Sequence, residues 1–283
     1  MPASLVKTLN VIGCGRVGQT LARLWQTQGS FAMLDLYGRS ADKAAAAAAF
    51  IGGGRPAAQL AAMRCADAWM LTVPDTQVAA VAAELAQHVP VADATNPPIA
   101  FHCSGFLGAA ALAPLRERGW LLASAHPLLN FASPETGVAQ FAGTPCGLEG
   151  DAAAVRMLAG ALLAIGGKSF DVASELKPLY HAAAVFSSNF TVVLQGVAQE
   201  AWRAAGVPEA LLPHLNAALL QTTVDNLLAM GPAKALTGPA ARGDTAVVQI
   251  QGDAVASWSP PAGDAYRTLS ALAVRLAQSG TAH

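Results

Sequence analysis

Residues 9–22 read LNVIGCGRVGQTLA and carry the strongest structural signal of the chain. A short apolar run leads into three glycines, and a helical pattern follows them. Gly13 allows a tight turn after a strand, Gly15 lets the backbone approach a pyrophosphate, and Gly18 lets the helix pack closely on the strand. Free N–H groups at the start of that helix would point at phosphates. The stretch therefore predicts a dinucleotide-binding strand, turn and helix, with cofactor contacts from Gly13, Cys14, Gly15, Arg16, Val17 and Gly18.

A basic turn follows the second predicted strand. Residues 31–37 form that strand, and Gly38-Arg39-Ser40 end it. In a dinucleotide-binding unit this end lies beside the adenosine ribose, where an acidic residue selects NAD. Arg39 offers a permanent planar cation and Ser40 a hydroxyl, which both suit a 2′-phosphate, so the turn favours NADP. Two alternatives stay open: Asp35 could reach the ribose if the strand ends earlier, and Arg39 could be a solvated surface charge.

The composition is that of a folded globular protein with few charges. Of its 283 residues, 53% are hydrophobic and 12% are charged, against about a quarter charged in an average domain, and the net charge is −1. Nothing in this balance favours nucleic acid or an acidic membrane as a partner, and no apolar run reaches the ~18 residues of a membrane span. We expect no apolar signal segment before the glycine turn. The four cysteines form no CxxC pair, which favours reduced thiols in a cytoplasm.

Strand and helix patterns alternate up to residue 172, and only helical patterns follow. The alternation predicts an α/β domain, residues 1–172, with a doubly wound, mainly parallel sheet and helices on both faces. Residues 173–283 are predicted to form an all-α domain for substrate binding and dimerisation. Gly206, Gly231 and neighbouring prolines mark its breaks. The predicted helices include 56–64 in the first domain, and 176–205, 208–230, 232–240, 244–256 and 261–278 later in the chain.

The apolar run at residues 68–73 is typical of a strand that is buried on both faces of a parallel sheet. The loop after such a strand faces the cofactor at the carboxyl edge of the sheet. We therefore predict cofactor contacts from Val73, Pro74 and Asp75. Asp75 is also the expected N-cap of a helix over 76–88, because its carboxylate can accept from free N–H groups there.

Polar side chains share one face of the predicted helix 176–205. Lys177, His181 and Ser188 fall at helical spacing among apolar residues. Because burying an unpaired Lys or His is costly, this face is either wet or lines an interdomain cleft beside a nicotinamide. In the cleft His181 could transfer a proton, Lys177 could stabilise an oxyanion or bind a carboxylate, and Asn189 could hydrogen-bond a substrate. A surface stripe with a satisfied histidine is the alternative.

Further polar residues stand where predicted strands leave the sheet. His102, Ser104 and His126 lie at this edge, where open α/β sheets bind ligands. Ser104 could offer its hydroxyl to a substrate and His126 could face the cleft, although a role in capping or packing is equally open for each histidine. Arg242 and Asp244 either contact substrate or form a salt bridge with each other. No HExxH, CxxC pair or carboxylate cluster predicts a catalytic metal.

Together these motifs resemble a known family. In chain order they are the glycine turn, Gly38-Arg39-Ser40, Val73-Pro74-Asp75, His102-x-Ser104-Gly105, His126-Pro127-Leu128, Tyr180-His181-Ala182-Ala183-Ala184 and Thr237-Gly238-Pro239-x-x-Arg242-Gly243-Asp244. The set spans nearly the whole chain and resembles the bacterial Rossmann-like proteins with a C-terminal helical domain of unknown function. Wider relatives are pyrroline-5-carboxylate reductase, the β-hydroxyacid dehydrogenases and the NADP oxidoreductases that use a deazaflavin. The resemblance implies a Rossmann-type fold, bound NADP and a homodimer, and the long apolar helices over 176–230 point to the same dimer.

One position departs from the wider relatives. The β-hydroxyacid dehydrogenases place a catalytic lysine four residues before an asparagine, whereas this chain has Val185 in that position before Asn189. Their mechanism therefore does not carry over. The sequence predicts an NADP(H)-dependent oxidoreductase that acts on a small polar carbonyl or imine compound, with a proton from His181, His126 or Lys177. The alternative is a module that binds NADP for regulation or sensing without turnover.

Overall fold

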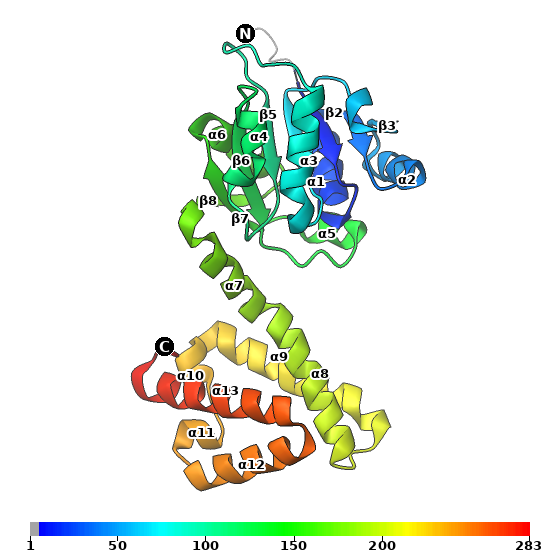
Figure 1. Ribbon diagram of the computed structural model, residues 1–283. Coiled ribbons are helices and arrows are strands. Elements are labelled where there is room, and N and C mark those ends of the chain that lie inside the picture. The colour runs from blue at the N-terminus through cyan, green and yellow to red at the C-terminus, as the bar shows by residue number, and fades with distance from the viewer. Residues whose placement is uncertain (1–5) are drawn as a thin grey trace. The chain divides into compact units, whose positions relative to one another are not determined.

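The computed structural model describes residues 6–283 and divides into two compact units (Figure 1). The first unit extends to Phe186 and the second is Ser187–His283. Sequence analysis placed the domain boundary at 172/173. In the structure helix α7, Lys177–Ser187, belongs almost entirely to the first unit, which ends at Phe186.

The first unit is built on an eight-stranded sheet with the order β3-β2-β1-β4-β5-β6-β7-β8. All neighbouring strands run parallel except β6 and β7, which are antiparallel. This confirms the predicted mainly parallel, doubly wound sheet. The strands are β1 Lys7–Ile12, β2 Phe31–Tyr37, β3 Arg55–Ala57, β4 Ala68–Leu71, β5 Ile99–His102, β6 Leu121–Pro127, β7 Pro145–Gly150 and β8 Lys168–Asp171.

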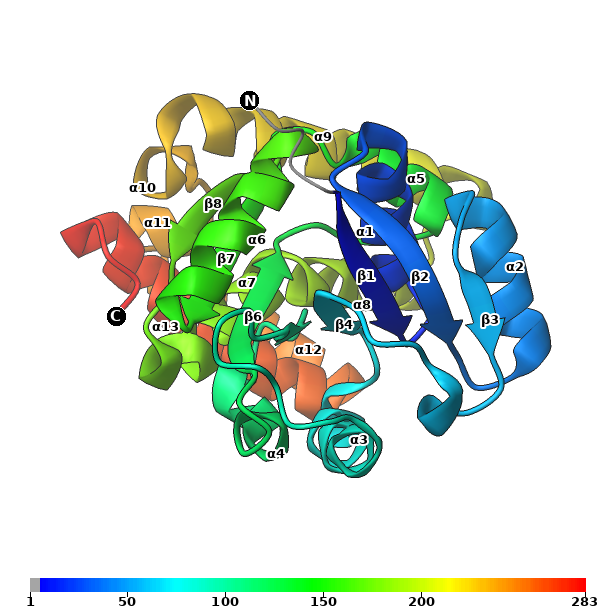
Figure 2. The ribbon, with the colours of Figure 1, turned by 90° about the horizontal axis from the view of Figure 1, so that it is seen from above.

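Helices cover both faces of this sheet (Figure 2). One core joins the strands to α1, α2 and α6, and at its centre Trp25 packs edge-on against Phe31 and Phe101. The other core packs α3 and α4 on the opposite face, around Trp69 and Trp120. All of β4 is buried, as its apolar run predicts. These helices are α1 Arg16–Gln28, α2 Ala41–Ile51, α3 Asp75–His88, α4 Ala113–Arg116, α5 Pro134–Gln140 and α6 Ala152–Ala164.

Three predicted helices are wrong. Residues 56–64 form most of strand β3 and a short 3-10 turn, Leu60–Ala62, because β3 pairs with β2 at the sheet edge, where a proline is tolerated. The predicted helix 176–205 is two helices, α7 and α8, with a break at Ser188, whose φ of −118° and ψ of −69° depart from helical values. The predicted helix 232–240 is two short helices, α10 Pro232–Ala235 and α11 Pro239–Arg242, because Leu236 is extended and Gly238 has a φ of +100°.

The second unit is helical throughout, which confirms the predicted all-α character of this part of the chain. Helices α12 and α13 pack closely because glycine stands at their contact: a Cβ on Gly263 would lie 2.6 Å from the Cα of Ala256. No helix in the described part of the chain is long and apolar enough to cross a bilayer. The helices are α8 Asn189–Ala204, α9 Leu212–Met230, α10 Pro232–Ala235, α11 Pro239–Arg242, α12 Thr245–Trp258 and α13 Pro260–Ser279.

Candidate functional site

The glycine turn between β1 and α1 has the predicted geometry. Gly13 has a φ of +100°, and a Cβ there would lie 2.6 Å from the backbone carbon of Thr72, so only glycine fits. A Cβ on Gly18 would collide with the side chain of Thr72, which donates a hydrogen bond to the carbonyl of Gly13. At Gly15, by contrast, the nearest atom to a Cβ would be 4.0 Å away, so this position faces open space. The open space lies at the N-terminus of α1, where a phosphate fits.

A cavity of about 570 Å³ opens beside this turn, at the carboxyl ends of β1, β2 and β4. It brings together Gly13, Cys14, Gly15, Arg39, Val73 and Pro74 from the predicted cofactor residues. Burial raises the pKa of the Cys14 thiol to about 11, so Cys14 contributes a neutral wall and no thiolate. The predicted residues that do not line the cavity are Arg16, Val17, Gly18, Ser40 and Asp75.

The basic corner of the cavity contains a residue that sequence analysis missed. Lys43 lines the cavity beside Arg39, so two cations stand where the ribose end of a dinucleotide would lie. Ser40 is the N-cap of α2, since its hydroxyl accepts a hydrogen bond from the backbone N–H of Lys43 at 3.3 Å. The sequence does contain a signal for Lys43 as a cofactor contact, because Lys43 stands three positions after the cap residue Ser40, in the first turn of α2.

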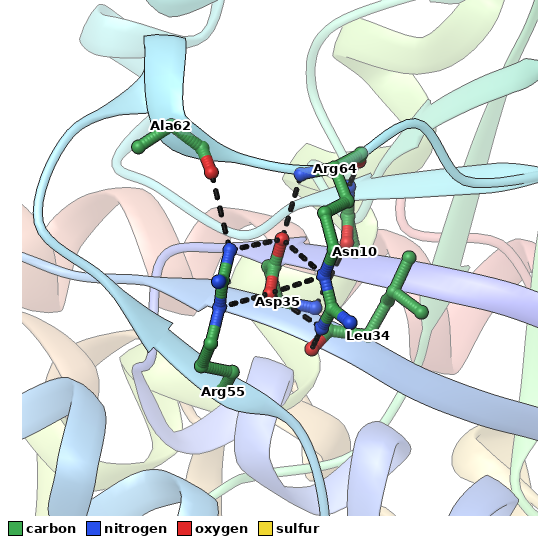
Figure 3. A network of polar contacts seen from close by, with 6 residues as sticks. All are labelled: Asn10, Leu34, Asp35, Arg55, Ala62 and Arg64. Carbon is green, nitrogen blue, oxygen red and sulfur yellow. Dashed lines mark hydrogen bonds and ion pairs between the residues drawn. The ribbon is translucent and has the colours of Figure 1, made fainter.

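Asp35 has no access to the cavity, although it was the alternative ribose ligand. Its fully buried carboxylate forms ion pairs with Arg55 at 3.1 Å and Arg64 at 2.7 Å and also accepts from the Arg64 backbone N–H (Figure 3). Burial alone would raise the pKa of Asp35, but these hydrogen bonds lower it below its ordinary value. Asp35 therefore ties β2 to β3 and to the loop that follows, and its oxygens are already occupied.

A second cluster lies where β5 and β6 leave the sheet and α7 begins. His126 Nδ1 lies 2.8 Å from the hydroxyl of Tyr180, and the rings of His126 and His181 meet edge-on with centroids 5.6 Å apart. Both imidazoles press on Gly105, where a Cβ would lie 2.8 Å from His126 Nε2 and closer still to His181 Nδ1. Two predicted catalytic residues are thus neighbours, and Gly105 is what allows them to approach.

Burial keeps the His126 imidazole and the Tyr180 phenol uncharged. It lowers the pKa of His126 to about 4, with further lowering by His181 and Lys177. Burial also raises the pKa of Tyr180 to about 12. His181 Nδ1 is buried and has no hydrogen-bond partner in the described structure. His126 and Tyr180 therefore present a neutral nitrogen and a neutral oxygen near neutral pH, which suits hydrogen bonding to a polar reacting group.

Lys177 lies inside the protein and does not form part of a surface stripe. Its side chain is 1% exposed, and its ammonium donates to the carbonyl of Ser104 at 3.0 Å and to the hydroxyl of Ser124 at 2.5 Å. Burial lowers its pKa, and nearby carboxylates, Glu149 first, partly oppose this. Lys177 thus fixes the loop after β5, a role that sequence analysis did not assign. Its action on substrate stays a prediction.

The Ser104 hydroxyl is likewise engaged within the first unit. It donates to Asp75 at 2.8 Å and accepts from the backbone N–H groups of Phe106 and Leu107. The N-cap of α3 is Pro74, with no side-chain cap, so the predicted capping role of Asp75 is wrong. Since Asp75 accepts from Ser104 instead, it joins the start of α3 to the loop after β5.

His102 has the structural role that was one of its two alternatives. Its Nδ1 accepts from the Ser104 backbone N–H, which leaves Nε2–H to donate to the Gly108 carbonyl at 3.0 Å. Burial lowers the pKa of His102, so the ring stays neutral. His102 therefore shapes the same loop that Lys177 and Asp75 hold.

The remaining predicted site residues belong to the second unit. Asn189 is the first residue of α8, and its contact with a substrate stays a prediction. Arg242 and Asp244 form an exposed ion pair at 3.1 Å, the simpler of their two alternatives. Among residues 6–283, no group of three or more His, Cys, Asp and Glu side chains could hold a metal ion.

Comparison with known families identifies both parts of the chain. A Rossmann-like domain model matches residues 3–127, and the model of a domain of unknown function, DUF2520, matches residues 144–273. These matches confirm the family that the motifs resemble. The comparison with curated proteins gives no match.

Solved structures share the fold over almost the whole chain. The protein TM1727 from Thermotoga maritima is 26% identical, with a TM-score of 0.74 over 96% of this chain and 99% of its own. A candidate NADP oxidoreductase from Bacteroides fragilis, BF3122, is 21% identical, with a TM-score of 0.75 over 95% and 98%. A pyrroline-5-carboxylate reductase from Coxiella burnetii is 15% identical, with a TM-score of 0.57 over 94% and 97%.

Proposed function

We propose that this chain, which belongs to the Rossmann-like proteins with a C-terminal DUF2520 domain, is an NADP(H)-dependent oxidoreductase. It would transfer a hydride between the nicotinamide and a small polar carbonyl or imine compound. Named reductases among the structural neighbours, including the pyrroline-5-carboxylate reductase, support this class of reaction. That the substrate binds between the two domains stays a prediction of the sequence.

The cavity at the carboxyl edge of the sheet carries this proposal. Its residues fit a dinucleotide: Gly15 leaves open the cradle in which a pyrophosphate would meet the N-terminus of α1. Arg39 and Lys43 supply two cations for a 2′-phosphate, and Asp35 is unavailable to bind a ribose hydroxyl. A bound NADP(H) would supply the hydride chemistry that no side chain can perform.

The ring cluster beside Gly105 supports the reductase alternative over simple cofactor storage. A reduction needs a hydrogen-bond or proton donor at the oxygen or nitrogen that gains charge when hydride adds to the adjacent carbon. His126 stands near the carboxyl end of β6, at the edge of the sheet that also holds the cofactor cavity, and His181 of α7 packs against its ring. We propose that they serve the reacting group, His126 as its donor.

A titration with NADPH and NADH, followed by fluorescence, tests the cofactor assignment. The wild-type protein should bind NADPH more tightly than NADH. Arg39→Ala and Lys43→Ala should each weaken NADPH binding about tenfold and leave NADH binding nearly unchanged, because each removes one charged contact to the 2′-phosphate. Arg156→Ala on α6 is the control, since it removes an exposed cation that does not line the cavity. Equal binding of both cofactors would exclude NADP selectivity, and binding of neither would exclude the oxidoreductase.

A second candidate function is an NADP-binding regulatory or sensor module. The observation in its favour is that Lys177, Ser104 and His102 all use their polar groups inside the protein. This candidate predicts NADPH binding without turnover on any carbonyl or imine in a broad panel. Turnover that His126→Gln abolishes, with NADPH affinity retained, would exclude it.

A further inference from the structure

We propose that Tyr180 is a positioning residue for His126. By donating its hydroxyl hydrogen to Nδ1, Tyr180 fixes the imidazole in the tautomer that carries its proton on Nε2. The Nε2–H group then is the donor presented to the oxygen or nitrogen of the substrate. The role toward substrate rests on the proposed function, whereas the tautomer is a property of the protein alone.

Tyr180 contacts the Nδ1 side of the His126 ring and is itself held in place by its neighbours. His126 is in β6, opposite Gly147 in the antiparallel strand β7, and Tyr180 reaches across from α7. A Cβ on Gly147 would lie 2.7 Å from the Tyr180 hydroxyl oxygen, so the missing side chain is what lets the phenol lie over the strand. The phenol ring also packs edge-on against Phe170 at a centroid distance of 6.1 Å. Tyr180 is therefore held in place to meet Nδ1.

The direction of the hydrogen bond follows from the two groups. The Tyr180 hydroxyl keeps its proton, and within residues 6–283 it has no hydrogen-bond partner other than His126. If Nδ1 carried the proton and donated, the hydroxyl hydrogen would have no acceptor in the described structure. When Tyr180 donates, both groups are satisfied, and a neutral imidazole that accepts at Nδ1 must carry its hydrogen on Nε2.

The Nε2 edge of the His126 ring lies against the loop after β5. Nε2 lies beside Gly105 in the loop after β5, and it makes no hydrogen bond within the described part of the chain. A neutral N–H in a sheltered site can stabilise a developing negative charge without first being protonated. His126 can therefore assist the reduction at neutral pH even though burial disfavours its charged form.

Nitrogen-15 NMR of the full-length protein with labelled histidine tests the tautomer directly. The His126 signals are assigned by their loss in His126→Gln. The wild type should show His126 as the Nε2–H tautomer, and Tyr180→Phe should give a mixture of both tautomers. Gly147→Ala, which displaces the hydroxyl without removing it, should loosen the tautomer in the same way. Tyr266→Phe is the matched control, since it removes a hydroxyl that donates to Gln251 in the second unit.

Two results would overturn the proposal: an Nδ1–H tautomer in the wild type, or an unchanged Nε2–H tautomer in both variants. NADPH titration of the same samples separates this from the proposed function, because the tautomer is read without turnover. If NADPH binds and a substrate turns over, Tyr180→Phe should lower kcat about tenfold with KM for NADPH unchanged. A kcat equal to that of Tyr266→Phe would exclude the role of the hydroxyl toward substrate.

Discussion

His126 shows how one partly buried side chain makes the stability of the protein depend on pH. Its pKa falls from an ordinary value near 6.5 to about 4 on folding, so the unfolded chain binds its proton more tightly. Between pH 6.5 and pH 4, lowering the pH therefore shifts the folding equilibrium toward the unfolded state. The neutral ring makes its whole contribution to the free energy of unfolding above pH 6.5, the pKa of histidine in the unfolded chain. As the pH falls toward 4, the pKa in the folded protein, this contribution is lost, and the loss is at most about 3 kcal/mol.

We therefore expect the free energy of unfolding to decrease from pH 7 to pH 4.5 and to decrease less in His126→Gln. Urea denaturation at several pH values measures both slopes. His88→Gln serves as the control, because His88 is an exposed residue at the end of α3. Parallel slopes for the wild type and His126→Gln would contradict the assignment of this proton to His126.

A substitution of Lys177 can tell whether this residue holds the loop after β5 in place or acts on the substrate. Lys177→Met keeps the apolar stem but removes the ammonium that donates to the Ser104 carbonyl and the Ser124 hydroxyl. The carbonyl keeps its bond from the Ser124 hydroxyl, and the loss of the two buried Lys177 bonds should cost about 1–3 kcal/mol in urea denaturation. Lys168→Met at the exposed strand β8 should cost almost nothing. If Lys177→Met kept full stability but lost turnover, the catalytic role predicted from the sequence would be supported instead.

The sequence predicts correctly the elements that depend on neighbouring residues in the chain. It does not predict the elements that depend on contacts between residues far apart in the chain. The glycine turn and the alanine-rich helix over 41–51 follow from the residues they contain. Strand β3 exists because Arg55 meets Asp35, twenty positions away, which no local pattern shows. The pairing of His126 with Tyr180 spans 54 positions. Sequence analysis therefore found the two histidines but missed the hydroxyl that orients one of them.

The glycine turn gives the sharpest test at the level of elements. Gly15 has a φ of −83°, which any residue adopts, and its Cβ position is open, so Gly15→Val should fold with wild-type stability. The valine would fill the phosphate cradle and weaken NADPH binding at least a hundredfold in a fluorescence titration. Gly13→Ala should instead destabilise the protein, because of its positive φ and its contact with Thr72. Tight NADPH binding by Gly15→Val would show that the glycine turn is not part of the cofactor-binding site.

The second unit exposes more large apolar side chains than a small helical domain that stays alone in water usually shows. Leu228 on α9 is 80% exposed and Ile250 on α12 is 70% exposed, and Val192 and Leu219 are also exposed. Few charges offset them, since only 12% of the chain is charged. We propose that a second copy of the chain covers these residues, as the resemblance also implies.

Light scattering on the purified protein should therefore give the mass of two chains. Leu228→Glu and Ile250→Glu, alone or together, should shift the mass toward one chain, because a carboxylate in a desolvated interface has no partner there. Leu163→Glu on α6 is the matched control, since Leu163 is equally exposed but lies on the first unit. A wild-type mass of one chain would refute the dimer. A dimer that both variants leave intact would place the interface on other residues of the second unit or on the first.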